Sequence, residues 1–425
     1  MNDQQRWMQD SSWLLRAMFL FTVNGFKKLS DDMKLIEISA LYWVIVFVID
    51  GILEIIDMKS QGMCFILLGA IAFLLFLFII GKPSGAVKTI RNFTRIGMFN
   101  KGGETPLLYD RYYEGNVIVL TYRNVGIPLS RWLDCKDDIE SGLNLNISNI
   151  SENGKKEIVI KAVSGDNILP DFIEWNDSVL SHKTFELILG ETYTGKVKAN
   201  LAVTPHLLIG GSTGSGKSIL LKCLLMQCVK KNADVIIADF KGGVDFPKKW
   251  HDKCVFITER ADLIKTLDNL VVELQRRKNL FSESECANIT EYNRKYHSNL
   301  RRIIFACDEV AELLDKTGLD KKQRDEISTV ESSIATIARL GRAFGIHSIL
   351  ATQRPDSNII SGQIKNNIDY RVCGRADDVL SQIILDKTDA SDLISKTAQG
   401  RFLTNSGVLF QGYWFDDKSG VEWNV

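Results

Sequence analysis

The sequence predicts an α/β fold for residues 196–425, in which strands and helices alternate around a parallel sheet. Two observations predict this fold. Short apolar runs, typical of buried strands, recur between segments with helical periodicity. One of these runs leads through a glycine-rich turn directly into a helix, which is how a phosphate-binding loop is built. A small α+β domain and a two-helix transmembrane hairpin are predicted to precede this part of the chain.

The glycine-rich turn is Gly211–Ser218, which fits the pattern G-x-x-x-x-G-K-[ST] without a mismatch. Glycines let the backbone curl so that its N–H groups and the start of the next helix face phosphates. In this pattern Lys217 reaches the β- and γ-phosphates, and the hydroxyl of Ser218 ligates Mg²⁺. A plain glycine-rich turn before a buried helix is the alternative. The predicted nucleotide-binding residues are Gly211, Ser212, Thr213, Gly214, Ser215, Gly216, Lys217 and Ser218.

The predicted strands point to the other residues of the site. In open α/β sheets ligands bind at the carboxyl ends of the strands, so the residues that directly follow each strand are the candidates. The predicted strands are Leu207–Ile209, Val235–Ala238, Val255–Ile257, Ile303–Cys307, His347–Ala351 and Tyr370–Cys373.

Two carboxylates, Asp308 and Glu309, directly follow the strand Ile303–Cys307. Asp308 is predicted to belong to the Mg²⁺ shell, as the corresponding aspartate of P-loop enzymes does. Glu309 is predicted to polarise the attacking water, because a carboxylate at this position can serve as a general base. A pair of solvated surface acids is the alternative interpretation.

Polar residues also end two other strands. Asp239 and Lys241 follow Val235–Ala238 and could serve the nucleotide or a neighbouring subunit, or could form a plain turn. Gln353 follows Thr352 at the end of another strand, where its amide could touch the γ-phosphate or the lytic water. A hydrogen-bonded strand end is the alternative for Gln353.

Several segments together share the pattern of one known family: Pro205–Ser218, Asp239–Gly243, Asp308–Glu309, Arg342–Pro355, Gly362–Ile368 and Ser381–Asp386. They resemble the FtsK/SpoIIIE DNA translocases, over about residues 185–410. The resemblance implies a RecA-like motor that assembles as a homohexameric ring and pumps double-stranded DNA through its channel using ATP and Mg²⁺.

The same resemblance assigns two further roles. It implies that Gln353 is a sensor and that Arg342 reaches the nucleotide of the neighbouring subunit. An arginine supplied in this way stabilises the charge of the transition state. Ion pairing on a helix surface is the alternative for Arg342, and also for Arg339 and Arg375.

Contacts with DNA require a local basic surface, because the chain has 52 basic and 52 acidic residues and no net charge. Lys321, Lys322 and Arg324 lie in a polar stretch that is predicted to be a channel-facing loop. Lys248–Lys249 and Arg276–Lys278 are further candidates. Such phosphate contacts would not depend on DNA sequence and would weaken with salt. A solvated face is the alternative for each cluster.

Two apolar stretches predict the membrane hairpin, residues 36–81. Met63–Gly81 has 19 residues without a charge, and a helix needs ~20 to cross the hydrocarbon core. Leu41–Ile56 is predicted to span as well, although Asp50 and Glu54 interrupt it. Both carboxylates could face the partner helix, or Glu54 could lie at the outer surface.

Basic residues flank this hairpin on both sides. The positive-inside rule therefore predicts that the N-terminal segment and the α/β part lie in the cytoplasm, with the short hairpin loop outside the cell membrane. Residues 1–35 could form an amphipathic surface helix. The basic residues are Lys27, Lys28 and Lys34 before the hairpin and Lys82, Lys88, Arg91 and Arg95 after it.

Residues 82–110 are predicted to be a linker, and residues 111–195 a small α+β domain without a catalytic constellation. We interpret this domain as a packing or oligomerisation module. Its predicted elements are the strands Val117–Leu120, Leu143–Ile147, Ile158–Ile160 and Phe185–Leu189 and the helix Ser130–Ile139.

Two spans, a small domain and one motor are most like the FtsK-type coupling proteins of conjugative elements in Gram-positive bacteria. Those proteins deliver a relaxase–DNA complex to a membrane secretion channel, so the resemblance implies relaxase and channel partners. One alternative is the ATPase of a type VII-like protein secretion system, which usually carries several motors in one chain. The other is a chromosome or division translocase, whose winged-helix reader is not expected here because the chain ends about 15 residues after its last recognisable segment.

Overall fold

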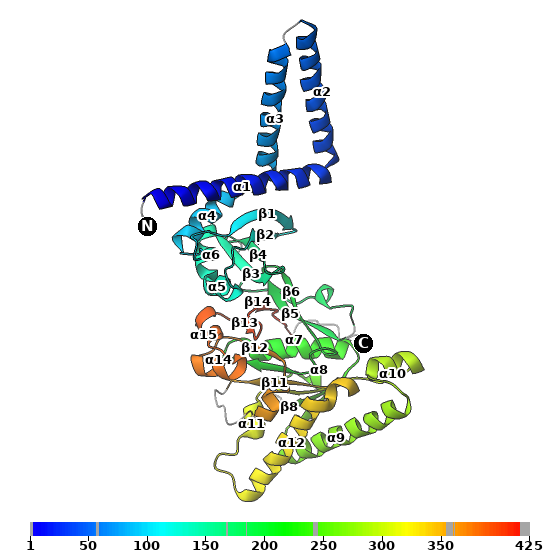
Figure 1. The fold of residues 1–425 in the computed structure, drawn as a ribbon. Helices are drawn as coiled ribbons and strands as arrows, with labels where there is room; N and C mark the ends of the chain where they lie inside the picture. The colour runs from blue at the N-terminus through cyan, green and yellow to red at the C-terminus, as the bar shows by residue number, and fades with distance from the viewer. Residues whose placement is uncertain are drawn as a thin grey trace. The chain divides into compact units, whose positions relative to one another are not determined.

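The computed structural model describes residues 3–56, 59–166, 169–183, 185–240, 245–353, 360 and 362–416, with the backbone alone for residues 3–14 and residue 59. The chain divides into two compact units, Met1–Ile168 and Leu169–Val425. Figure 1 shows the elements of both. Each unit is described by itself.

The first unit joins three long helices to a small sheet domain. Its four strands form one antiparallel sheet in the order β1-β2-β4-β3. Its elements are α1 (Asp3–Asp31), α2 (Met33–Ile55), α3 (Lys59–Gly81), α4 (Ala86–Arg95), β1 (Leu107–Glu114), β2 (Val117–Arg123), α5 (Leu129–Asp134), α6 (Lys136–Leu143), β3 (Leu145–Glu152) and β4 (Glu157–Ser164).

Helices α2 and α3 are both long and apolar enough to cross a membrane. In the most apolar stretch of each helix only 11 % of the residues are buried, whereas the core helix of a soluble protein is mostly buried. The two helices touch where the Tyr42 hydroxyl donates to the carbonyl of Gly69 at 2.8 Å. Asp50 lies against α3, because a Cβ on Gly62 would come within 2.5 Å of its Oδ1. Glu54 lies in the last turn of α2.

Helix α1 crosses α3 at close range and also packs on the small domain. A Cβ on Gly25 would lie 2.0 Å from the Leu77 carbonyl oxygen, so only glycine allows this crossing. The side-chain amide of Asn24 donates to the carbonyl of Gly81 and to that of Tyr109, both at 2.7 Å. Phe21 is buried in the core of the small domain. The predicted N-terminal helix is therefore tied to both neighbours.

The core of the small domain is built on three buried aromatic rings. Phe93, Tyr122 and Trp132 have ring centroids 5.3 to 5.4 Å apart. Phe93 belongs to α4, whose buried face packs on this core. The prediction that residues 82–110 form a linker is therefore wrong, because an amphipathic helix there supplies part of the core. The predicted helix Ser130–Ile139 is two helices, α5 and α6, which meet at Cys135.

The second unit is built on a ten-stranded sheet. Its order is β6-β5-β14-β13-β12-β7-β11-β10-β8-β9. Its elements are η1 (Asp177–Val179), β5 (Glu186–Thr192), β6 (Gly195–Asn200), β7 (Leu207–Gly210), α7 (Lys217–Lys230), β8 (Asp234–Ala238), α8 (Lys248–His251), β9 (Val255–Ile257), α9 (Arg260–Glu283), α10 (Ile289–Tyr296), β10 (Ile303–Cys307), α11 (Val310–Leu314), α12 (Lys321–Phe344), β11 (Ile346–Thr352), α13 (Gly362–Lys365), β12 (Tyr370–Cys373), α14 (Asp378–Leu385), α15 (Asp389–Leu393), β13 (Arg401–Thr404) and β14 (Leu409–Gly412).

The six strands predicted from the apolar runs form the contiguous parallel part of this sheet, β12-β7-β11-β10-β8-β9. The other four strands continue it as antiparallel neighbours. This result corrects the predicted boundary at residues 195 and 196. β5, predicted as Phe185–Leu189 of the small domain, pairs with β14 and belongs to the large sheet.

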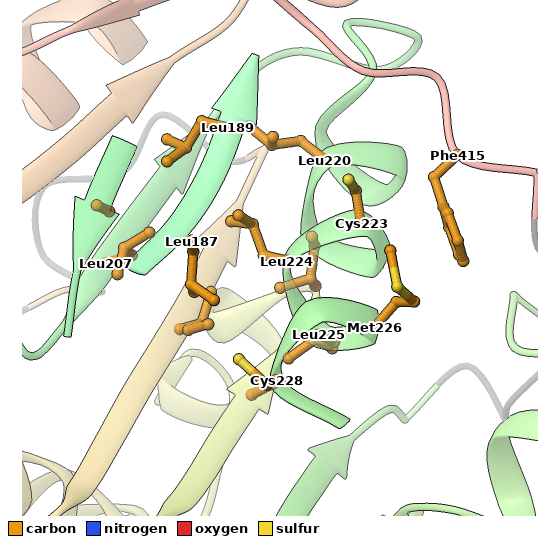
Figure 2. Packing of buried hydrophobic residues seen from close by; sticks show 14 of the residues in the cluster. Leu187, Leu189, Leu207, Leu220, Cys223, Leu224, Leu225, Met226, Cys228 and Phe415 are labelled. Atoms are coloured by element: carbon orange, nitrogen blue, oxygen red, sulfur yellow. The ribbon is translucent and has the colours of Figure 1, made fainter. Parts of the chain in front are cut away.

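Alternate residues of the parallel strands bury on opposite faces, so the unit has three layers. Leu207 and Ile209 lie in one hydrophobic cluster with α7, whereas Leu208 lies in the other with α9 and α12. Figure 2 shows how Leu224 and Leu225 of α7 lie against the sheet. α7 is apolar around most of its circumference, so it is buried almost completely. Its first residue, Lys217, is among the buried ones.

Two buried histidines sit at the amino ends of β7 and β11. The Nδ1 of His206 accepts a hydrogen bond from the backbone N–H of Ser348 at 2.9 Å. Burial lowers the pKa of His206 from 6.5 to about 4. The pKa of His347 is also lowered, chiefly by burial and then by the nearby Arg302 charge. Both imidazoles are therefore neutral in the folded protein at neutral pH.

We expect the free energy of unfolding of the second unit to fall as the pH drops below 6.5. The unfolded chain then binds a proton at His206 that the folded protein excludes, since the pKa is depressed only in the fold. This linkage is worth about 2 kcal/mol between pH 7 and pH 5. Thermal unfolding at both pH values measures it. His206→Asn keeps an acceptor for Ser348 and should reduce this pH dependence, whereas His297→Asn, at an exposed histidine, should not. Equal pH dependence in all three proteins would contradict the assignment.

Candidate functional site

The phosphate loop joins β7 to α7 within the parallel part of the sheet. β7 lies between β12 and β11, so the loop emerges where strands flank it on both sides. Glycine is required at two positions of this loop. Gly214 has φ 75° and Gly216 has φ 96°, values that other residues rarely adopt. A Cβ on Gly216 would also lie 2.9 Å from the backbone nitrogen of Gly400.

The predicted Lys217, Ser218 and Asp308 converge on one point. The Lys217 ammonium lies 2.9 Å from Oδ1 of Asp308 and 2.5 Å from the Asp308 carbonyl oxygen. The Ser218 hydroxyl lies 2.9 and 3.1 Å from the two carboxylate oxygens. The side chains of Lys217 and Asp308 are only 4 % and 5 % exposed. The ammonium neutralises a buried carboxylate, which would otherwise be costly in this setting.

This group of side chains fits a nucleotide with Mg²⁺. Mg²⁺ is commonly held by one or two protein oxygens together with phosphates and water. The hydroxyl of Ser218 and the carboxylate of Asp308 are the oxygens that could hold it. Lys217 and the N-terminus of α7 supply the positive charge for the phosphates.

Glu309 is oriented by β11, the strand that lies between β7 and β10. The Thr352 hydroxyl donates to Oε1 of Glu309 at 2.7 Å, and the Gln353 backbone N–H donates to Oε2 at 3.0 Å. Glu309 is 5 % exposed. With each oxygen held by a different donor, the carboxylate has a defined direction, as a residue that positions a water requires.

Gln353 connects Glu309 to the phosphate loop. Its side-chain Oε1 accepts a hydrogen bond from the Thr213 hydroxyl at 2.9 Å, while its backbone N–H binds Glu309. A change in the position of Thr213 can therefore reach Glu309 through Gln353 alone. The structure thus brings Gln353, Glu309 and the phosphate loop together.

Arg375 also belongs to this site, although its sequence interpretation was a surface ion pair. It follows β12 and donates through Nη2 to the Thr213 carbonyl at 2.6 Å. Its own carbonyl accepts from the Ser212 backbone N–H at 2.8 Å. Arg375 thus holds the phosphate loop from the side of β12. Residues that follow strands line the site, and Arg375 follows the predicted strand Tyr370–Cys373, so this rule could have identified Arg375 from the sequence.

Arg342 lies apart from this group. It is exposed in the last turn of α12, just before β11 begins, and its Nε donates to the carbonyl of Ala202 at 3.1 Å. β11 and β7 are parallel, and the phosphate loop follows the end of β7. Arg342 is therefore at the amino edge of the sheet, opposite the phosphate loop of its own chain.

The predicted DNA-binding residues Lys321, Lys322 and Arg324 are all exposed. They form the first turn of α12 and not a loop, because Asp320 caps this helix in a capping box with Gln323. Their charges therefore lie at the N-terminal end of α12.

The other basic clusters differ in exposure. Lys248 and Lys249 are exposed on α8. Arg277 is 2 % exposed and binds the carboxylate of Glu273 and the carbonyl of Phe344, so it is a structural residue. Arg276 pairs with the same Glu273 at 2.6 Å.

Asp239 is buried directly after β8, the neighbour of β10, which places it near Asp308. Lys241 and Arg354, which also belong to the predicted strand-end turns, lie outside the described residues.

Comparison with known proteins identifies the family of the chain. The model of the FtsK/SpoIIIE family matches residues 174–357. The DNA translocase FtsK of Treponema pallidum is 33 % identical over 227 residues, which are 49 % of this chain and 27 % of that protein. The FtsK of Oceanobacillus iheyensis is 31 % identical over 302 residues, which are 65 % of this chain and 37 % of that protein. The chain thus spans well under half the length of these curated relatives.

A solved structure matches much more of its own length. The pCW3 conjugation coupling protein TcpA, in a monomer form with ATPgS, is 35 % identical with a TM-score of 0.60. The match covers 80 % of this chain and 98 % of that one. The predicted RecA-like P-loop fold and the predicted family are both confirmed. The chain belongs to the FtsK/SpoIIIE family, and its second unit is a P-loop ATPase motor.

Proposed function

We propose that this protein is a membrane-anchored, ATP-driven translocase of double-stranded DNA that serves as the coupling protein of a conjugative transfer system. The observation that carries the proposal is the match to a conjugation coupling protein over 98 % of that protein's chain. The FtsK translocases, by contrast, are matched over 27 to 37 % of their length. Relaxase and channel proteins are the partners that this role requires.

Hydrolysis of ATP uses the residues at the ends of β7, β10 and β11. In the structure the Lys217 ammonium binds the carboxylate of Asp308. When ATP is bound, Lys217 moves to the β- and γ-phosphate oxygens, which are also negatively charged. Ser218 and Asp308 would hold Mg²⁺, which would supply positive charge against the charge that develops on the phosphates. Glu309 orients the water that attacks the γ-phosphorus as the bond to the β-phosphate oxygen breaks.

Coupling to movement begins at the link between Thr213, Gln353 and Glu309. Loss of the γ-phosphate changes the surroundings of Thr213 in the phosphate loop, and Gln353 carries this change to Glu309 and to the end of β11. Arg342, at the opposite edge of the sheet, is available to a neighbouring subunit. We infer a homohexameric ring in which each site is completed by the next subunit.

The DNA contacts come from the basic start of α12, Lys321, Lys322 and Arg324. Their exposure suits non-specific binding to phosphates. The ring multiplies this small surface, which a chain with no net charge needs.

Helices α2 and α3 are the membrane anchor in this proposal. Large apolar side chains such as Val44 and Leu68 are 57 % and 60 % exposed, and lipid would cover them. The basic flanks place α1 and the motor in the cytoplasm. Asp50 lies against Gly62 of the partner helix.

Two other functions are compatible with an FtsK-like motor: a type VII-like protein secretion ATPase, and a chromosome or division translocase. A relaxase gene beside the gene for this chain supports conjugation. Genes for small WXG-type substrates there would favour protein secretion instead.

ATP turnover of the full chain should be stimulated by double-stranded DNA, with the stimulation declining as salt rises. Lys217→Ala should lower turnover by about 10²–10³-fold with DNA present, since it removes a positioned charge from the transferring phosphate. Phosphate release measured with and without DNA gives both results. Lys196→Ala, at an exposed lysine of the edge strand β6, is the matched control. Rings that hydrolyse ATP without any response to DNA would contradict the translocase.

Glu309→Gln should bind ATP normally but hydrolyse it about 10²–10⁴-fold more slowly, because the amide cannot accept a proton from water. Nucleotide affinity and single-turnover hydrolysis separate the two effects. Thr352→Val should show a milder defect of the same kind, since it removes the donor to Oε1. Normal turnover in Glu309→Gln would show that another group positions the water.

Mixing experiments test the role of Arg342 in a neighbouring subunit. Arg342→Ala alone should lose about 10³–10⁵-fold in turnover if it completes the next site. Adding Lys217→Ala chains, which keep Arg342, should restore part of the activity in mixed rings. No recovery in mixed rings would rule out action between subunits.

A further inference from the structure

A polar cavity of about 490 Å³ opens on the small sheet domain of the first unit. The start of α4, the hairpin of β1 and β2, the start of β3 and the end of β4 form its walls. Its volume falls within the range of small-ligand sites, which is roughly 300–1,000 Å³. The residues proposed for ATP hydrolysis and DNA binding all belong to the second unit, so the cavity has no part in either.

The cavity carries an excess of positive charge. Among the described residues that line it, two side chains are basic, Lys88 of α4 and Arg111 of β1, and none is acidic. Lys88 is exposed, and its ammonium donates to the carbonyl of Leu143 at 3.2 Å. Because an ammonium has three N–H donors, two remain for a ligand. The lining therefore suits an anion.

The guanidinium of Arg111 is held in place by the protein itself. Its Nη1 donates to the Ser84 carbonyl and its Nη2 to the Tyr113 hydroxyl, both at 3.1 Å. It also lies 5.7 Å from the centroid of the Tyr113 ring, a favourable place for a cation. Each terminal nitrogen carries two N–H groups, so one on each remains for a ligand. Such donors suit the oxygens of a phosphate, which arginine binds with paired N–H groups.

The start of α4 adds further donors to the cavity. This ten-residue helix has Gly85 as its N-cap, and no side chain caps it. The first N–H groups of such a helix are available to an anion, and the helix dipole favours negative charge there. Gly85 has φ 87°, and a Cβ on it would lie 3.1 Å from Nη1 of Arg111. Glycine thus brings the helix start close to the guanidinium.

The cavity lies close to the end of the apolar helix α3. Ser84 lines it and comes three residues after Gly81, the last residue of α3. Three residues span at most about 11 Å. Arg111 follows Tyr109 by two residues, and the amide of Asn24 binds the carbonyls of Tyr109 and Gly81, both at 2.7 Å. With α3 in the membrane, the cavity is at the level of the lipid headgroups, a layer roughly 5–8 Å thick on each side of the hydrocarbon core.

We propose that this cavity binds the phosphate of an anionic lipid headgroup at the cytoplasmic surface of the membrane, with Arg111 and Lys88 as the residues that contact it. The polar side chains of Asn116 and Ser164, which also line the cavity, suit the hydroxyls of a glycerol headgroup. A choline headgroup carries a cation that the two basic residues would repel. The inference rests on the membrane anchor of the proposed function, and it adds a lipid specificity that apolar helices do not provide.

Native mass spectrometry of the full chain in detergent micelles tests the inference, with phosphatidylglycerol or phosphatidylcholine titrated in. The first phosphatidylglycerol should bind about 10–100-fold more tightly than the first phosphatidylcholine, because no cation on the lipid opposes its contacts with the basic residues. Lys88→Ala and Arg111→Ala should each weaken the first phosphatidylglycerol by about 10-fold or more. Arg111→Lys should restore only part of the loss, since lysine keeps the charge but lacks the planar fork.

Lys155→Ala is the matched control, because it removes the same charge from the same domain. Lys155 is exposed in the turn between β3 and β4, at the end of that hairpin opposite to Leu145 and Ser164, which line the cavity. The affinity for phosphatidylglycerol should not change in this variant. Unchanged thermal unfolding of the three other variants shows that their small domain stays folded.

Equal affinity for the two lipids in the unmodified chain would overturn the inference, and so would a phosphatidylglycerol preference that survives both alanine variants at the cavity. Soluble glycerol phosphate is the third ligand. If it binds as tightly as phosphatidylglycerol, the cavity takes a soluble phosphate ester, and the lipid assignment is wrong.

Carbonate extraction of membranes that contain the chain tests the anchor separately. The chain should stay in the membrane fraction. Its release into the soluble fraction would overturn the anchor on which the inference rests, whereas loss of lipid selectivity in a chain that stays in the membrane would overturn the lipid site alone.

Discussion

The buried pair of Lys217 and Asp308 is the interaction on which the motor depends. It places two opposite charges at the edge of a sheet whose strands are otherwise apolar on both faces. Each charge is tolerable because the other is within 2.9 Å, and removing either leaves a buried charge at a cost of about 3–5 kcal/mol. A polyphosphate can take the place of the carboxylate as the partner of Lys217, so the pair holds the site ready for a nucleotide.

Strand order determines how this pair is connected to the rest of the site. β11 lies between β7 and β10, so its end, Thr352 and Gln353, reaches both the phosphate loop and Glu309. On the other side of β7, the antiparallel strands β13 and β14 bring Gln411 and Trp414 to a cavity beside the loop. The parallel strands thus carry the candidate site residues, and the antiparallel extension adds walls of the cavity beside the loop.

The first unit shows how apolar helices are attached to a folded domain. Glycines at the crossing of α1 and α3 allow backbone contact, and Asn24 bonds to carbonyls of both α3 and β1. A hairpin held only by its own loop could rotate freely, whereas these bonds and the buried Phe21 connect it to the sheet domain. These contacts join the apolar helices and the small sheet domain into one compact unit.

The sequence by itself determined the parallel strands and the phosphate loop and pointed to the candidate site residues, because each is a local pattern. Lys217, Ser218, Asp308 and Glu309 are recognisable from a few neighbouring residues and from the strands that precede them. The places where prediction failed depend on distant contacts. The prediction of a linker at residues 82–110 fails because the aromatic partners that bury Phe93, Tyr122 and Trp132, come from later in the chain. β5 was assigned to the wrong unit because its partner β14 lies more than 200 residues away. Only the tertiary structure decided that Gln411 lies beside the phosphate loop, since pairing within a sheet joins residues that no sequence spacing relates.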